Sequence, residues 1–273
     1  MRLYIHAGTF KTASSAIQNS LYSRREALLK HHILYPEAGI SKKMSEEVGF
    51  RHSRIVYHYG KSDWDNIVAN LKKSLFHHNP HTVILSSEAW STPGASETLF
   101  SLIEHLQEFD VDKIDIAFVV RNVFDYSISH YREFVRRWGF KYDYLEYVEK
   151  RLDYFDYNAL FSPFLENNKV TVKFIPYSKS CVDAVLKDMN AAPTGFWNKP
   201  EKKKVNKSLS ALDIEIQRKF NILHGGKGYV APQATELLAR IGLKPTGEKI
   251  LESTPPVLLS DSLPICIKKS LPS

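Results

Sequence analysis

Residues 2–18 read RLYIHAGTFKTASSAIQ and predict a strand, a loop and a helix in that order. The strand contains the apolar residues Leu3 and Ile5 and ends at His6, and the loop after it is built of small residues around one lysine, Lys11. A helix N-terminus presents unpaired N–H groups and the positive end of the helix dipole, and small residues let further backbone donors come close to an anion. Loop hydroxyls and the charge of Lys11 add to these donors. The segment therefore predicts a binding site for a phosphorylated or sulfated small molecule.

The nucleoside triphosphate P-loop is the first motif to compare with this segment. That motif requires G-x-x-x-x-G-K-[ST]. Here Gly8 lies only three residues before Lys11, and Phe10 stands where the second glycine is needed. A P-loop-type kinase that acts on a small molecule with ATP and Mg²⁺ stays an alternative, but the missing glycine counts against it.

Strands and helices alternate along most of the chain, which predicts an α/β fold with three layers, a parallel central sheet flanked by helices. The strands are predicted at about 2–6, 81–87, 114–120 and 170–175, and the helices at about 13–30, 62–76, from Thr92-Pro93 onward, from Asn122 onward, 180–189 and 209–223. Thr92 and Asn122 are the predicted N-caps of their helices, and the helix after Asn122 is predicted to bury Trp138. We expect one domain over residues 1–273, with its core at about 1–190 and a helical, basic segment at about 198–273. Ligands of such sheets bind beyond the carboxyl ends of the strands, where His6, Ser87, Arg121 and Tyr177 are expected.

The first segment resembles the phosphosulfate-binding loop of sulfotransferases that use 3'-phosphoadenosine 5'-phosphosulfate (PAPS). Those families read approximately Gly-x-x-Lys-(Ser/Thr)-Gly-(Ser/Thr)-(Ser/Thr) directly after the first strand, often with Gln one helical turn later. The matching residues are Gly8, Lys11, Thr12, Ser14, Ser15 and Gln18. Phe10 replaces the common proline or histidine, and Ala13 replaces the usual glycine. Our hypothesis is that position 13 needs a backbone conformation that alanine resists.

A second segment resembles the 3'-phosphate motif of the same sulfotransferases, in which an arginine ends a later strand and a serine follows eight residues on. Arg121 ends the strand at 114–120, Ser129 follows at that spacing, and Tyr131 stands two residues further. Arginine offers a bidentate fork to a phosphate. The fold that the resemblance implies is the P-loop-NTPase-like fold of sulfotransferases, closest to bacterial relatives of the carbohydrate enzymes.

The resemblance implies transfer of the sulfuryl group of PAPS to a hydroxyl of a carbohydrate or glycoconjugate, with 3'-phosphoadenosine 5'-phosphate (PAP) as the product and no metal. Lys11 is expected to stabilise the departing oxygen, and Glu88 is the first choice for the base that accepts the acceptor's proton. His52 and His130 are rivals for the role of base. The nucleotide-binding residues implied are Gly8, Thr9, Phe10, Lys11, Thr12, Ala13, Ser14, Ser15, Arg121, Ser129, Asn206, Lys207 and Ser208. An inactive family member that binds nucleotide or anionic glycan is a further alternative.

The composition of the chain helps to exclude some classes of binding partner. Its net charge is +7, yet the basic residues are scattered and no helix-turn-helix, zinc finger or RNA-binding motif is present, so we expect no nucleic acid. Its two cysteines have no metal-ligand spacing, and no apolar stretch reaches the length of a signal peptide or a membrane span. We expect a cytoplasmic, bacterial enzyme. Candidate residues for an acceptor groove are Arg51, His52, Arg54, Tyr57, His58, Tyr59, Arg136, Arg137 and Trp138.

Overall fold

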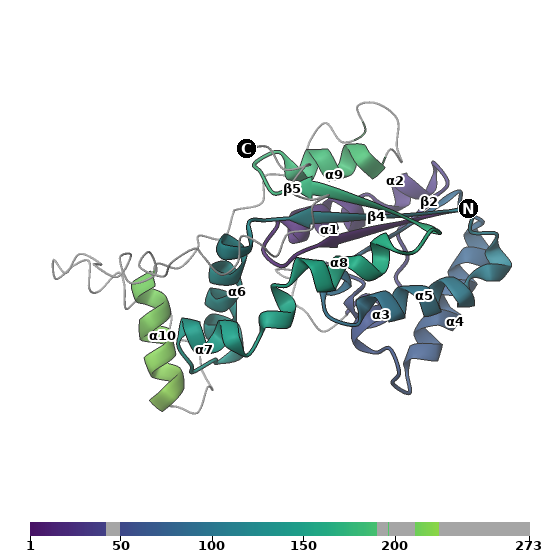
Figure 1. The fold of residues 1–273 in the computed structure, drawn as a ribbon. Helices are drawn as coiled ribbons and strands as arrows, with labels where there is room; N and C mark the ends of the chain where they lie inside the picture. Colours follow the sequence, from purple (N-terminus) through teal and green to yellow (C-terminus); the bar gives the residue numbers. More distant parts are fainter. Residues whose placement is uncertain (42–49, 190–195, 197–210, 224–273) are drawn as a thin grey trace. The chain divides into compact units, whose positions relative to one another are not determined.

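The structure is a computed structural model, and it describes residues 1–41, 50–189, 196 and 211–223 (Figure 1). The described residues form two compact units. The first contains the described residues up to Arg121 and those that follow Phe155, as far as Phe196. The second contains Asn122–Phe155 together with one helix near the end of the described chain.

The first unit is built on a parallel sheet of five strands, in the order β2-β3-β1-β4-β5. The strands are β1 (Arg2–Gly8), β2 (Ile33–Leu34), β3 (Thr82–Ser86), β4 (Lys113–Val120) and β5 (Val170–Pro176). β1 lies between β3 and β4, with Ile5 opposite both Leu85 and Ile116. All three of these residues are fully buried, as strands covered on both faces require. The parallel sheet confirms the predicted fold class, and only the two-residue strand β2 was not predicted.

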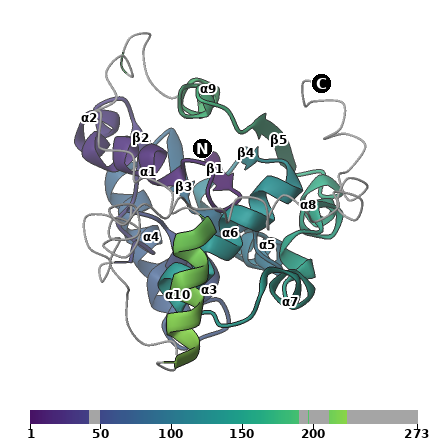
Figure 2. The same ribbon diagram turned by 90° about the vertical axis from the view of Figure 1, so that its left-hand side faces the viewer.

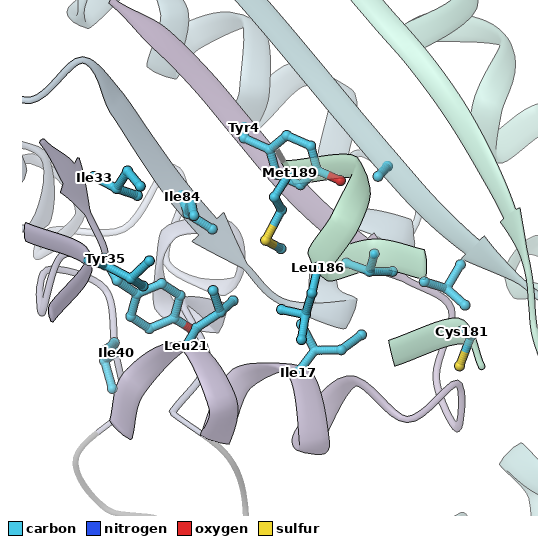
Figure 3. Packing of buried hydrophobic residues seen from close by; sticks show 14 residues of the cluster. Tyr4, Ile17, Leu21, Ile33, Tyr35, Ile40, Ile84, Cys181, Leu186 and Met189 are labelled. Atoms are coloured by element: carbon cyan, nitrogen blue, oxygen red, sulfur yellow. The ribbon is translucent and has the colours of Figure 1, made fainter. Parts of the chain in front are cut away.

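Helices cover both faces of this sheet and give the fold its three layers. The helices of this unit are α1 (Ser14–Ser23), α2 (Arg25–Leu29), α3 (Ser53–Tyr57), α4 (Trp64–His78), α5 (Ala95–His105), α8 (Tyr157–Leu165) and α9 (Cys181–Met189), with 3₁₀ turns η1 (Glu88–Ser91) and η2 (Gln107–Phe109). On one face, α1 and α9 pack Ile17, Leu21 and Leu186 against Tyr4 and Ile84 of the sheet (Figure 3). On the other face, Phe118 packs against Phe161 of α8, with ring centroids 4.5 Å apart.

Two predicted helices differ from the structure at their ends. The helix predicted at 13–30 is two helices, because the backbone leaves the helical conformation at Arg24. The helix predicted from Thr92-Pro93 begins later, at Ala95, with Gly94 as the N-cap at φ 77°. The Thr92 hydroxyl instead donates to the carbonyl of Ala89 (2.7 Å), which closes the 3₁₀ turn η1. That prediction was wrong because Thr92 ends one element rather than beginning the next.

The second unit consists of α6 (Val123–Trp138), α7 (Tyr144–Glu149), the turn η3 (Leu152–Tyr154) and α10 (Ala211–Leu223), which lies beside α6 (Figure 2). Asn122 caps α6 as predicted, because its Oδ1 accepts from the N–H groups of Phe124 (2.9 Å) and Asp125 (3.4 Å). Trp138, predicted to be buried by this helix, is 70% exposed. It is the last residue of α6, where Gly139 ends the helix with φ 64°. Within the described residues, the helices are all too short or too polar to cross a membrane.

Candidate anion-binding site

The predicted anion loop and Arg121 begin at neighbouring strand ends of the first unit. β1 and β4 are adjacent and parallel, with Gly8 opposite Val119. The N–H of Thr9 continues this pairing by donating to the Val119 carbonyl (3.0 Å), and the Thr9 hydroxyl donates to the same oxygen (3.2 Å). Adjacent strands lie about 4.8 Å apart. The residues that follow β1 and β4 therefore emerge side by side at the carboxyl edge of the sheet, where ligands of parallel sheets bind.

The loop reaches α1 through two left-handed residues, Lys11 at φ 68° and Ala13 at φ 62°. The hypothesis that position 13 needs a conformation that alanine resists is confirmed. For an L-residue this conformation costs roughly 1–2 kcal/mol. Ala13 is also the N-cap of α1 and supplies no side-chain acceptor to the first turn. The first N–H groups of α1 therefore have no capping side chain, and a bound anion would satisfy them.

The hydroxyl groups of the loop divide into buried and exposed ones. Thr9, Thr12 and Ser14 are buried, and the Thr12 hydroxyl donates to the Thr9 carbonyl (2.6 Å), so it stabilises the loop itself. Ser15 and Lys11 are exposed. A ligand that approaches from solvent thus meets the side chains of Lys11 and Ser15 and the N–H groups of the first helical turn.

Gly8 is required by the close approach of the loop to β1. A Cβ atom on Gly8 would lie 2.5 Å from Ser14 Oγ and 2.7 Å from Thr12 Oγ1. Both distances are shorter than carbon and oxygen atoms tolerate, so any side chain here would displace the two hydroxyl groups. Position 8 is therefore glycine in this chain because no side chain fits there.

Several buried polar atoms at this edge of the sheet have no hydrogen-bond partner in the part of the chain that the structure describes. They include His6 Nε2, Ser14 Oγ, Gln18 Oε1 and Trp90 Nε1. Leaving a buried polar group unpaired costs about 1–3 kcal/mol, so native proteins rarely do so without a ligand, a water or a function. Of these atoms, the Ser14 hydroxyl and Trp90 Nε1 can donate a hydrogen bond, whereas Gln18 Oε1 can only accept one. The helix N-terminus without a capping side chain is the observation that fits the site to an anionic group.

Arg121 is half-buried at the end of β4 and lies over the ring of Tyr177, with its guanidinium carbon 5.0 Å from the ring centroid. Its carbonyl accepts a hydrogen bond from the Tyr157 hydroxyl (2.9 Å), which also interacts with the Thr9 side chain. Burial raises the pKa of Tyr157, so this phenol stays protonated. Tyr157 thus joins the loop to the end of β4. Sequence reasoning missed this role because a tyrosine in an apolar helix reads as core.

Glu88, the predicted base, begins the 3₁₀ turn after β3 and is 7% exposed. Its Oε2 accepts from Gln18 Nε2 of α1 (3.1 Å) and lies 3.9 Å from Arg51 Nη1. The same turn is joined to the anion loop, because the Ser91 hydroxyl donates to the Gly8 carbonyl (2.9 Å). Glu88, Gln18 and the loop are therefore neighbours in one unit.

The two rival bases differ from Glu88 in their surroundings. His52 is fully buried and uses both ring nitrogens: Nδ1 accepts from the Ser86 N–H (3.0 Å), and Nε2 bonds to the Pro36 carbonyl (2.8 Å). Burial lowers its pKa to about 4. His52 therefore cannot accept a proton from a substrate without losing a structural bond. His130 lies in the second unit, buried, with Nδ1 bonded to the Tyr147 hydroxyl (2.8 Å).

The remaining predicted residues lie in the second unit or outside the described residues. Ser129 is half-buried on α6. Tyr131 is buried, its hydroxyl donates to the Tyr142 carbonyl (3.2 Å), and burial raises its pKa to about 12. Asn206, Lys207 and Ser208 fall outside the described residues. Where the structure describes the chain, no group of three or more His, Cys, Asp or Glu side chains is arranged to hold a metal ion.

The candidate residues of the acceptor groove belong partly to the first unit and partly to the second. Arg136, Arg137 and Trp138 belong to the second unit. In the first unit, Asp63 binds two of the candidates, Arg54 Nη2 (2.9 Å) and His58 Nδ1 (2.7 Å). Tyr57 and Tyr59 are 44% and 38% exposed. Both tyrosine side chains therefore reach solvent in part, and the ring of Tyr59 also contacts that of Trp64.

Comparison of the sequence with known proteins finds no matching family model and no matching curated protein. Among solved structures, the chain is similar to the mouse sulfotransferase SULT7A1 complexed with PAP. The match has a TM-score of 0.35 and 13% identity, and it covers 93% of this chain and 89% of that one. A likeness of this size gives no support to a family or an activity.

Proposed function

We propose that this chain is a sulfotransferase that moves the sulfuryl group of PAPS to a hydroxyl of a carbohydrate or glycoconjugate. The observation that carries the proposal is the pairing of β1 with β4, with Gly8 opposite Val119. This pairing starts the Lys11 loop and Arg121 from adjacent strand ends. One nucleotide with phosphate groups at both ends of its ribose could contact the two segments at once.

Each segment has chemistry suited to one end of the nucleotide. The uncapped N–H groups of α1 and the exposed Lys11 favour the 5'-phosphosulfate. Arg121 favours the 3'-phosphate, which its guanidinium can bind in a bidentate manner. We assign Ser129, Asn206, Lys207 and Ser208 to the same nucleotide on the family resemblance alone.

In the proposed reaction, the acceptor oxygen forms a bond to sulfur while the bond from sulfur to the 5'-phosphate oxygen breaks. PAP leaves with the bonding electron pair, and its new negative charge is stabilised by Lys11 and the helix N-terminus. The acceptor's proton passes to Glu88. The hydrogen bond from Gln18 and the nearby Arg51 act on Oε2 of this carboxylate, so Oε1 is the oxygen that we assign to the acceptor.

The acceptor class that we propose is based on two aromatic side chains at the end of α3 and just after it. α3 packs against η1, the turn that begins with Glu88. The partly exposed rings of Tyr57 at the end of α3 and of Tyr59 offer aromatic faces, on which the C–H faces of a sugar can stack. A carbohydrate hydroxyl is therefore the acceptor that we propose.

Calorimetry with PAP tests the nucleotide site. The wild-type chain should bind PAP at micromolar concentration or tighter without Mg²⁺. Lys11→Ala and Arg121→Ala should each weaken binding at least tenfold, whereas Lys73→Ala removes an exposed lysine of α4 and should change nothing. No binding by the wild-type chain, or binding of ATP that depends on Mg²⁺, would contradict the proposal, and the second result would favour the kinase.

Transfer of radiolabelled sulfate from PAPS to a panel of glycans tests the reaction. We expect Glu88→Gln to keep PAP affinity within about twofold and to lose most turnover, because an amide cannot accept the proton. If the wild-type chain binds PAP tightly and labels no glycan, small phenol or peptide, the chain is an inactive nucleotide-binding protein.

A further inference from the structure

His6 is a buried imidazole beneath the anion loop to which the predicted reaction assigns no role. It is the third-last residue of β1, it is fully buried, and it shares a sheet face with Tyr4 and Gly8. Its Nδ1 is hydrogen-bonded to Ser86 Oγ at the end of β3 (2.7 Å). Its Nε2 has no partner among the described residues.

A chain of hydrogen bonds fixes which nitrogen of His6 carries the proton. The Tyr35 hydroxyl donates to the Phe50 carbonyl (2.6 Å), since a carbonyl can only accept. Burial raises the pKa of Tyr35, and the Ser86 side chain lowers it in part, as a hydroxyl that donates to the phenol oxygen does. Because the one proton of Tyr35 is already used, the Ser86 hydroxyl donates to Tyr35. Ser86 Oγ must then accept from His6, so Nδ1 carries the proton and Nε2 presents a lone pair.

The lone pair of His6 Nε2 borders the same small space as the hydroxyl of Ser14. A Cβ atom placed on Gly8 would lie 3.5 Å from His6 Nε2 and 2.5 Å from Ser14 Oγ. Ser14 is 2% exposed, and its Oγ also has no partner in the described part of the chain. A hydroxyl that can donate and a nitrogen that can accept thus both border the position of the missing Gly8 side chain. The other nearby hydroxyl, Thr12, is already used in its bond to the Thr9 carbonyl.

Burial also keeps His6 uncharged. Removal from water lowers its pKa to about 3, so the ring is neutral at physiological pH. A neutral ring with one lone pair adds no charge to the anion site, but it can orient a donor.

We propose that His6 is a positioning residue of the anion site, whose Nε2 accepts a hydrogen bond from the Ser14 hydroxyl when the loop binds an anion. This bond holds the first turn of α1 against the end of β1, and it aims the N–H groups of that turn at the ligand. The inference rests on the proposed function only for the identity of the ligand as PAP; inorganic pyrophosphate serves as a probe that needs no nucleotide site.

Nitrogen NMR of the histidine side chains detects the proposed hydrogen bond from the Ser14 hydroxyl to His6 Nε2. In the free protein, His6 should show a protonated Nδ1 and an unprotonated Nε2, with its signals assigned by their loss in His6→Asn. Saturating PAP or pyrophosphate should shift the Nε2 signal in the direction of an accepted hydrogen bond, and Ser14→Ala should remove that shift. A protonated Nε2 in the free protein, or an Nε2 signal unchanged by both ligands, would overturn the inference.

Two substitutions of His6 separate positioning from simple stability. His6→Asn retains a donor near the position of Nδ1 and lacks Nε2, whereas His6→Gln can place an amide oxygen near the position of Nε2. We expect His6→Asn to lower PAP affinity about tenfold, the loss of one good hydrogen bond, and His6→Gln to recover most of it. In His6→Asn, adding Ser14→Ala should cause little further loss, because the two residues share one bond. Additive losses, or wild-type affinity in His6→Asn, would contradict the proposal.

The two proposals fail in different ways. If pyrophosphate shifts the NMR signal of His6 Nε2 but PAP does not bind, the positioning role of His6 is supported and the proposed nucleotide is wrong. If PAP binds and the NMR signal of His6 Nε2 does not change, the proposed nucleotide is supported and the proposed role of His6 is wrong. If neither ligand binds the wild-type chain, both proposals fall.

Discussion

Gly8→Ala should damage the anion loop while leaving the sheet intact. The added Cβ would lie 2.5 Å from Ser14 Oγ and 2.7 Å from Thr12 Oγ1, where ordinary contact begins at 3.4 Å. Overpacking of this kind costs about 1–3 kcal/mol, and loss of the Thr12 bond to the Thr9 carbonyl adds about 0.5–1.5 kcal/mol. The lower entropy of the unfolded chain with alanine returns about 0.4–1 kcal/mol. The free energy of unfolding should therefore fall by about 0.5–4 kcal/mol.

Urea unfolding of the wild-type chain and the variant measures this loss, and calorimetry with PAP measures the effect on the site. The matched control is Gly8→Ala combined with Ser14→Ala, which removes the atom closest to the new Cβ. Ser14→Ala alone removes a buried hydroxyl that has no partner among the described residues, so it is measured separately. The double variant should recover more stability relative to Gly8→Ala than Ser14→Ala adds to the wild-type chain. The reasoning is refuted if Gly8→Ala unfolds at the same urea concentration as the wild-type chain, or if Ser14→Ala stabilises Gly8→Ala no more than it stabilises the wild-type chain.

Three further predictions concern the loop and the buried His52. Ala13→Gly should raise the midpoint of thermal unfolding. Glycine removes the cost of a left-handed alanine, roughly 1–2 kcal/mol, and this gain exceeds the roughly 0.4–1 kcal/mol by which glycine raises the entropy of the unfolded chain. An unchanged or lower midpoint in a thermal scan contradicts this prediction. Lys11→Ala should change the unfolding free energy by no more than about 0.5 kcal/mol, since the side chain is exposed, while the affinity for PAP falls. If denaturation and binding assays show that stability and PAP affinity fall by similar free energies, Lys11 stabilises the fold rather than binding the ligand. Stability should fall as the pH drops from about 6.5 to 4, because burial lowers the pKa of His52 to about 4 and the unfolded chain takes up the proton first. The slope is up to about 1.4 kcal/mol per pH unit for this group, and urea titrations of His52→Gln should show a flatter dependence.

The order of strands and helices was predictable because each element has its own periodicity and its own apolar face. The strand at 114–120 is apolar at nearly every position, and it is β4, between two other strands. The cap at Asn122 was predictable for a local reason, since an N-cap bonds only to its own helix. The two-residue strand β2 carries no periodic signal, and its pairing with β3 depends on contacts distant in sequence.

The candidate site was predictable in its residue types but not in the direction of its side chains. Ser14 belongs to the motif, but its hydroxyl lies beside Gly8 and His6 inside the protein, and only the close approach of loop and strand reveals this. The role of Tyr157 depends on a contact with residues far away in the sequence, Thr9 and Arg121. The left-handed backbone at position 13 was suggested by the glycine that the resembled family has there, and the structure confirmed it.

The central claim is that the loop after β1 and Arg121 after β4 bind one nucleotide from its two ends. Calorimetry with PAP and with adenosine 5'-phosphate, which lacks the 3'-phosphate, tests it on the wild-type chain and on Arg121→Ala at one salt concentration. We predict that the wild-type chain binds PAP at least tenfold more tightly than adenosine 5'-phosphate and that Arg121→Ala binds the two about equally. Equal affinities in the wild-type chain, or a preference for PAP that survives in Arg121→Ala, would contradict the claim.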